Sequence, residues 1–222
     1  MPVATVTKPT KQDYQAMTRA ELDELSALLH SFSDAQWDEP SLCDGWKVRH
    51  VIGHVCMGST TSPIALIPRL VPYRFNLPLA SSRESFKYGE AHTPSEMLDT
   101  FDRVVVAQPR PGLGKLAPPN EWFVDKLIHQ QDIRRPQGLT RTIAPSHLVA
   151  ALDALPRLGG FIQSKRVCKG LTFTATDVDH SVGSGPEVRG PGEALVLAMS
   201  GRPIGLAELE GDGVATLRER IT

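Results

Sequence analysis

Two histidines and an aspartate are the residues whose types and spacing best suit metal chemistry. Asp125 and His129 are four residues apart in FVDKLIHQQDIRR, so in a helix their side chains leave the same face about one turn apart. His54 lies in a second helical stretch, GWKVRHVIGHV. Two imidazoles and one carboxylate can bind a divalent cation and leave one coordination position open for chemistry. The pattern therefore predicts a metal site formed by His54, Asp125 and His129.

Each of these residues also has a plainer interpretation. Asp125 could cap its helix or form a helix-stabilising hydrogen bond with His129. His54 could be a core histidine whose hydrogen bonds are satisfied without an ion. His50 precedes His54 by four residues and falls at the edge of the apolar stripe, whereas His54 lies in register with it. We therefore expect His54, rather than His50, to point into the bundle.

Polar residues after His129 offer further groups for a site. Asp132, three residues later, could orient His129 by accepting a hydrogen bond or could pair with Arg135, and the ion pair is the interpretation we favour. Arg134 and Arg135 are the candidates for binding a carboxylate of a cofactor or substrate. The alternative for both arginines is a solvated position that favours the C-terminal helix dipole.

Composition excludes several classes of partner and compartment. The chain has 222 residues and a formal net charge of −1, with its basic residues scattered, so neither nucleic acid nor a membrane is an expected partner. Its three cysteines show no CxxC spacing, which is typical of a reducing compartment. Without an apolar leader or a span of ~20 apolar residues, a cytoplasmic protein is expected. Cys56 is predicted to be a small core residue.

Hydrophobic periodicity predicts a helical bundle followed by a small mixed unit. The proline-rich stretch 63–82 predicts short helical turns and a loop that could cover a pocket. Helices are expected at 12–32, 46–58, 93–107, 120–135 and 146–163. Strands are expected at 171–176 and 186–189, with further helices at 192–200 and 213–220. We therefore predict an all-α domain over 1–163 and a small α+β domain over 164–222.

Three stretches resemble a known family. LCDGWKVRHVIGHV resembles the second-helix signature of the DinB-like bundle superfamily. DKLIHQQDIRRPQG resembles the corresponding ending in the mycothiol-dependent maleylpyruvate isomerase branch of that superfamily. The tail from Leu171 to Pro203 is similar to the small, sterol-carrier-like C-terminal domain of that branch. The resemblance implies an α+β protein, with a DinB-like four-helix bundle followed by a small C-terminal α+β domain.

The resemblance also implies a ligand set and a nearby arginine. It implies a divalent metal, usually zinc, held by His54, Asp125 and His129. The isomerase pattern has glutamate at the acid position, so Asp125 is one methylene shorter, and a water bridge could make up the difference. The family uses an arginine of the small domain near the site, for which Arg189 and Arg202 are the candidates.

These features predict a metal-dependent transferase or isomerase. In this interpretation the metal activates mycothiol, or a similar low-molecular-weight thiol, for attack on a small electrophile. A second interpretation is a non-catalytic bundle that binds a ligand or a protein partner, and the aspartate in place of glutamate favours it. A third is a metal-dependent hydrolase, in which water takes the position of the thiol.

Overall fold

The computed structural model describes residues 8–108, 110–159, 162 and 164–222, which form two compact units. The bundle unit comprises Thr18–Pro118 and Asp125–Arg141. The C-terminal unit comprises residues 8–17, Pro119–Val124 and Thr142–Thr222. The first turns of two long helices, α1 and α6, therefore cluster with the C-terminal unit, while the rest of each belongs to the bundle unit. All the residues predicted to bind metal lie in the bundle unit.

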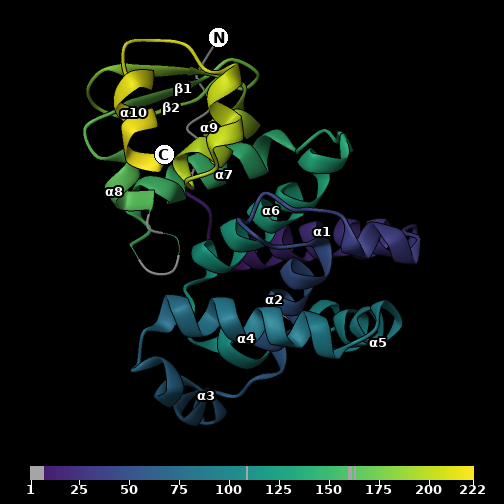
Figure 1. Ribbon diagram of the computed structural model, residues 1–222. Helices are drawn as coiled ribbons and strands as arrows, with labels where there is room; N and C mark the ends of the chain where they lie inside the picture. The colour runs from purple at the N-terminus through teal and green to yellow at the C-terminus, as the bar shows by residue number, and fades with distance from the viewer. Residues whose placement is uncertain (1–7, 109, 160–161, 163) are drawn as a thin grey trace. The chain divides into compact units, whose positions relative to one another are not determined.

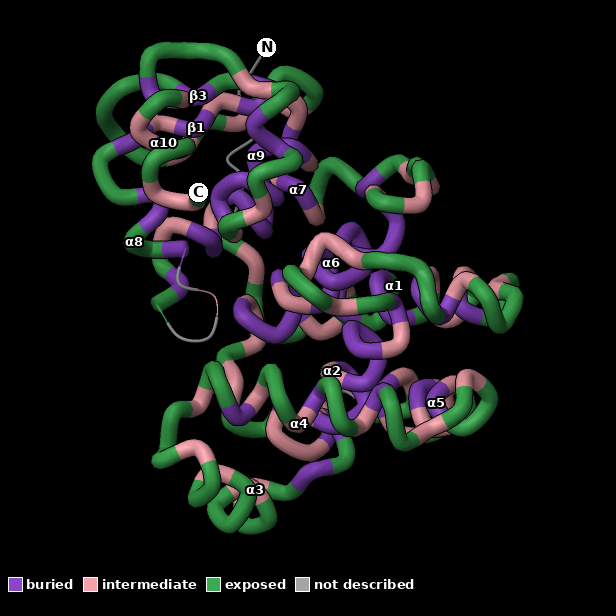
Figure 2. The backbone as a smooth tube through the Cα atoms, viewed as in Figure 1, coloured by how far each residue is buried: buried purple, intermediate pink, exposed green. Residues whose placement is uncertain are grey.

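The bundle unit is built, over its described residues, from six α-helices and is shown in Figure 1. Apolar side chains of α1, α2, α5 and α6 meet in one core, which includes Leu25, Ile52, Phe101 and Ile133. Most residues of α2 are buried (Figure 2), as expected for the central helix of the unit. The helices are α1 (Lys11–His30), α2 (Val48–Thr60), α3 (Pro63–Leu70), α4 (Leu77–Ala91), α5 (Pro94–Thr100) and α6 (Pro119–Arg134).

The helix expected at 93–107 is present, but its second half is wound more loosely. Thr93 caps α5 together with Glu96 in a reciprocal capping box. Beyond Thr100 the chain continues as a π-helix over Phe101–Val106. The wider winding still points Phe101 and Val105 into the core, where both are fully buried.

The expectation of short turns and a loop over 63–82 is wrong in its second half, where α4 begins. Pro63 and Pro78 each lie in the first turn of a helix, where proline needs no hydrogen-bond partner and its fixed φ suits the helix. Ser62 and Asn76 accept hydrogen bonds from the backbone amides of Ala65 and Leu79 and so cap α3 and α4. These prolines therefore mark the starts of helices rather than breaks in them.

Two glycines let the backbones of α2 and α4 touch. A methyl group added at Gly53 would lie 2.9 Å from both the Gly89 nitrogen and the Ser85 carbonyl oxygen. Both of these atoms belong to the backbone of α4, so a side chain at Gly53 cannot be accommodated by rotation of a neighbouring side chain. The close approach brings the side chain of Ser85 within reach of His54 on α2.

Replacing Gly53 by alanine is therefore expected to destabilise the bundle unit by about 1–3 kcal/mol, the usual result of overpacking. Gly58→Ala, on the same helix, serves as the matched control, because a methyl group added at Gly58 would meet no atom within 4 Å. Without a clash, the better helix propensity of alanine should raise stability by about 0.5–1 kcal/mol. Urea unfolding of both variants measures the difference, and equal stabilities would contradict the proposed backbone contact.

The C-terminal unit combines helices with a three-stranded sheet of order β2-β1-β3. β1 pairs with β2 antiparallel and with β3 parallel, so Phe173 lies opposite Val182 on one side and Val188 on the other. The predicted α+β class is thus confirmed, although β2 was not expected because three residues show no usable alternation. The elements are α7 (Pro145–Ala154), α8 (Ser164–Cys168), β1 (Thr172–Ala175), β2 (Ser181–Gly183), β3 (Glu187–Gly190), α9 (Gly192–Met199) and α10 (Val214–Ile221).

The division between the two units does not coincide with the domain boundary expected from sequence. Helix α7 clusters with the C-terminal unit because it packs against α9, whereas the sequence assigns residues up to 163 to the bundle. A functional division into 1–163 and 164–222 stays a prediction. Among the described residues, no helix has both the length and the apolar character needed to cross a membrane.

Candidate metal centre

His54, Asp125 and His129 lie together in the bundle unit. His54 is on α2, while Asp125 and His129 occupy successive turns of α6. One ligand atom from each residue lies within 4.8 Å of the other two, close enough for one cation to contact all three after a modest adjustment of the side chains. Asp125 Oδ1 is 3.3 Å from His129 Nε2. The two imidazole rings meet edge to face, with centroids 5.0 Å apart.

A serine of α4 determines which nitrogen of His54 is available. His54 Nδ1 lies 3.1 Å from Ser85 Oγ, and the Ser85 hydroxyl donates its proton to the carbonyl oxygen of Ser81 at 2.6 Å. Since the hydroxyl has only one proton, Ser85 must accept a hydrogen bond from Nδ1–H of His54. The neutral ring therefore carries its lone pair on Nε2, the nitrogen that remains for Asp125 and His129.

An aspartate of α6 orients His129 in the same way. His129 Nδ1 is 2.9 Å from Asp132 Oδ2, and the buried carboxylate also accepts a hydrogen bond from Cys43 Sγ at 3.3 Å. Cys43, His129 and Asp132 also have ligand atoms within 4.8 Å of one another, but their contacts are explained by these hydrogen bonds. Asp132 thus has the orienting contact considered from sequence, which is the usual support of a metal-binding histidine. Its pairing with Arg135 stays a prediction.

Burial and charge set different protonation states for the two histidines. Burial, reinforced by the neighbouring His129, lowers the pKa of His54 to about 3, so this ring is neutral at physiological pH. Burial also opposes a charge on His129, but the carboxylates of Asp125 and Asp132 outweigh it and raise its pKa well above the ordinary value. For Asp125, burial is outweighed by Lys126 and His129, which hold its pKa well below the usual range.

Zinc binding at this centre is expected to release about one proton per ion at pH 7, because the ligand nitrogen of a protonated His129 must first lose its proton. Zinc affinity should therefore fall as the pH is lowered. In the metal-free protein, the raised pKa of His129 contributes stability below the ordinary histidine pKa, and that contribution is lost as pH rises through the raised value. Calorimetric titration in buffers of different ionisation enthalpy counts the proton. Zinc uptake without proton release would contradict the assignment.

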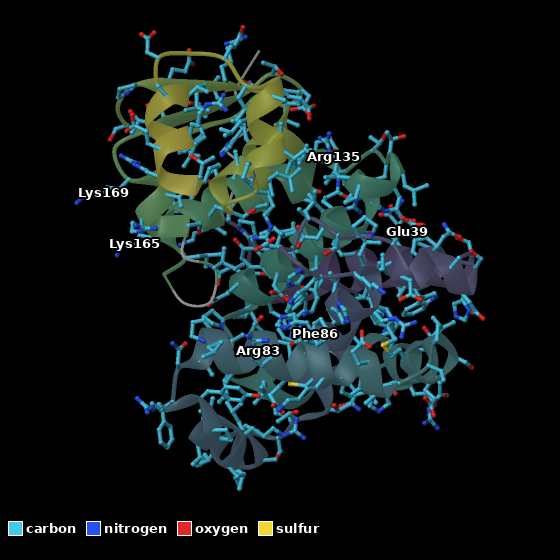
Figure 3. The ribbon with its side chains drawn as sticks, in the orientation of Figure 1. Glu39, Arg83, Phe86, Arg135, Lys165 and Lys169 are labelled. Atoms are coloured by element: carbon cyan, nitrogen blue, oxygen red, sulfur yellow. The ribbon has the colours of Figure 1, made fainter. Side chains whose placement is uncertain are left out.

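The other residues singled out from sequence lie in different surroundings. His50 is buried and accepts a hydrogen bond from the backbone amide of Lys47. Its Nε2 lies 2.7 Å from Glu90 Oε1, and its ring stacks on that of Phe86. Phe86 lies on α4 and is labelled in Figure 3. His54, rather than His50, thus lies beside Asp125, as expected. The expectation that His50 falls at the edge of the buried face is wrong, since His50 is only 1% exposed. Cys56 is fully buried in the bundle core, which confirms its predicted place there, and burial raises its pKa to about 12.

None of the four candidate arginines is established as a binding residue. Arg134 is mostly buried and its Nη2 donates to Glu24 Oε1 at 3.1 Å, which gives it a structural role. Arg135 is half-buried just beyond α6 (Figure 3). Arg189 on β3 lies near Glu210, and Arg202 donates to the carbonyl oxygen of Ser200. The cofactor role of Arg134 and Arg135 and the catalytic role of Arg189 and Arg202 stay predictions.

Ser85 and Lys126 contact the predicted ligands but were not predicted from the sequence. Lys126 has only 2% of its side chain exposed, and its Nζ lies 2.6 Å from Asp125 Oδ2. A lysine next to a candidate ligand acid is a signal that the sequence offers. Ser85 had no comparable signal, because its helix was not predicted.

A known protein family matches part of the bundle unit. Residues 18–110 match the family described as the mycothiol maleylpyruvate isomerase N-terminal domain. The matched residues make up most of the bundle unit. The match to the mycothiol maleylpyruvate isomerase N-terminal domain includes His54 but ends before Asp125 and His129, so the contribution of α6 to the site comes from the structure alone.

Solved structures extend the likeness of fold to nearly the whole chain. Crystal structures of the mycothiol-dependent maleylpyruvate isomerase and of a histidine-to-alanine variant of it superpose with TM-scores of 0.57 and 0.62. Each is 16% identical in sequence, and each comparison covers 95% of this chain and 96% of the other. At this identity the likeness shows the fold. No curated protein matches the chain.

Proposed function

We propose that this protein is a metal-dependent transferase or isomerase that uses mycothiol, or a similar low-molecular-weight thiol, to attack a small electrophile. The observation that carries the proposal is the pair of hydrogen bonds at the two Nδ1 atoms. Ser85 and Asp132 engage the Nδ1 atoms of His54 and His129, which leaves Nε2 as the nitrogen of each ring that can bind an ion, and His129 Nε2 lies 3.3 Å from Asp125 Oδ1. A histidine pair oriented in this way beside a carboxylate is the arrangement of a catalytic zinc site with an open position.

The donor set fits a zinc ion. Two imidazole nitrogens and one carboxylate oxygen are ligands that zinc prefers, and His54 is already neutral. The shorter acid does not prevent contact, since Asp125 Oδ1 reaches to 3.3 Å from His129 Nε2. This supports direct coordination by Asp125 rather than a bridge through water. Bound there, a divalent cation supplies the Lewis acidity that lets a thiol ionise near neutral pH.

The surrounding residues prepare the site for that chemistry. Ser85, Asp132 and Cys43 hold the two imidazoles at fixed angles before any ion arrives, which lowers the cost of organising the ligands. His129 is 9% exposed and Asp132 is fully buried, so little water competes for these hydrogen bonds. A preorganised, poorly hydrated centre strengthens every electrostatic interaction made within it.

A second candidate function is supported by the charges of the site. Asp125 already has two partners of opposite charge, Lys126 and the protonated His129. A cluster that is charge-balanced without an ion favours a non-catalytic bundle, which keeps the fold and binds a small ligand or a protein. Metal content separates this candidate from the first.

The test is metal content combined with thiol dependence. Purified protein dialysed against micromolar zinc is analysed for bound metal, and consumption of maleylpyruvate is then followed with and without mycothiol. Stoichiometric zinc and turnover that requires the thiol would support the proposal. Zinc with turnover independent of thiol would indicate a hydrolase instead. Protein that excludes zinc under these conditions would contradict the metal centre and leave the non-catalytic bundle.

A further inference from the structure

The two oxygens of Asp125 have different partners. Oδ1 is 3.3 Å from His129 Nε2, whereas Oδ2 lies 2.6 Å from Lys126 Nζ. Oδ1 is thus the oxygen that faces the candidate ligands, and Oδ2 is held by an ammonium group. The lysine side chain is only 2% exposed and the aspartate side chain 20% exposed, so this contact differs from an exposed ion pair that exchanges freely with water.

The contact is also not an automatic result of sequence adjacency. Neighbouring residues of a helix do not face one another, so Lys126 must fold back along α6 to reach the carboxylate beside it. Burying an ammonium group is costly unless it is paired. A cation at this place also repels a divalent ion. The contact between Lys126 and Asp125 therefore lowers metal affinity, so we expect a functional advantage that offsets this loss.

We propose that Lys126 is a positioning residue that limits Asp125 to one ligand oxygen and thereby keeps a coordination position open. An aspartate can bind a cation through one oxygen or through both. With Oδ2 held by Lys126, the site offers three ligand atoms, the two Nε2 atoms and Oδ1. Without Lys126, Oδ2 would become a fourth ligand and fill the position that a thiol needs. The inference rests on the metal centre proposed above.

Cobalt is the probe for this proposal, because its visible spectrum reports coordination number and its near-ultraviolet absorption reports a bound sulfur. Wild-type protein and Lys126→Met are loaded with Co²⁺ and titrated with 2-mercaptoethanol. The variant is expected to bind Co²⁺ with an altered visible spectrum. Its affinity for the thiol should fall by an amount on the order of the 10- to 100-fold that loss of a residue supporting a metal ligand costs in metal affinity or activity. Thermal unfolding verifies that each protein is folded.

Two further variants make the experiment decisive. Lys126→Gln carries an uncharged side chain one bond shorter than that of lysine. It replaces Lys126→Met if that variant does not fold, and the same loss of thiol affinity is expected for it. Lys47→Met is the control, since Lys47 forms an exposed ion pair with Asp38 in the same unit, and it should behave as wild type.

The outcomes separate this inference from the metal centre itself. Wild-type protein that does not bind Co²⁺ would contradict the proposed function. Wild-type protein that binds both Co²⁺ and thiol, together with a folded Lys126 variant of unchanged spectrum and unchanged thiol affinity, would overturn only the role of Lys126.

Discussion

Replacing His129 by alanine is expected to lower zinc affinity on the order of 1,000-fold, because it removes one of three protein ligands. His54→Ala should have a similar effect. In each variant the remaining imidazole and Asp125 form an incomplete set that cannot hold the ion against a competing chelator. The effect should appear in zinc stoichiometry after dialysis and in titration against a chromophoric chelator.

His50→Gln is the matched control for these two variants. His50 lies on the same helix as His54 and is more deeply buried, but its partners are Lys47, Glu90 and Phe86. The variant is therefore expected to lose stability while keeping its zinc. Stoichiometric zinc in either His54→Ala or His129→Ala would refute the ligand assignment, whatever the result for His50.

Arg141→Met is expected to destabilise the bundle unit by about 3–5 kcal/mol, the usual cost of breaking a buried ion pair. Arg141 Nη2 and Nη1 each lie 2.6 Å from a carboxylate oxygen, one of Glu21 and one of Glu24. Arg141 and Glu21 have only 5% and 2% of their side chains exposed. The substitution would leave Glu21 charged and buried, and it would also remove a hydrogen bond from Arg141 Nε to Gln131 on α6.

Two comparisons test this explanation by chemical denaturation. Adding Glu21→Gln to Arg141→Met should recover much of the loss, because the stranded charge is then removed. Arg103→Met, which breaks an exposed pair with Asp99, should cost no more than about 1 kcal/mol. A double variant as unstable as Arg141→Met alone would show that the charge on Glu21 is not the cause.

The sequence predicts the bundle well where apolar residues recur with helical spacing. The periodic pattern of α1 and α2 places Leu25 and Ile52 in the core, where both are found buried. The spacing of Asp125 and His129 likewise predicts that they share one face of α6. In the structure Asp125 Oδ1 lies 3.3 Å from His129 Nε2. The zinc-binding experiments above test whether they bind metal.

Residues that support the candidate ligands were harder to predict, because their roles depend on tertiary contacts. Ser85 reaches His54 only because Gly53 and Gly89 let two backbones approach closely, and no local pattern reports such an approach. Asp132 has several partners within reach, and sequence spacing alone does not rank them. The helix α4 was missed because proline was interpreted as a helix breaker, although at the first turn it favours helix formation.

Burial of two cysteines has a bearing on how this protein would tolerate oxidative stress. Burial raises the pKa of both Cys56 and Cys168 to about 12, so almost no thiolate is present at neutral pH. Mixed disulfides form by attack of a thiolate, and these two side chains would therefore resist S-thiolation when a small-molecule thiol pool becomes oxidised. A protein that uses such a thiol would thus protect its own buried cysteines from forming mixed disulfides with it.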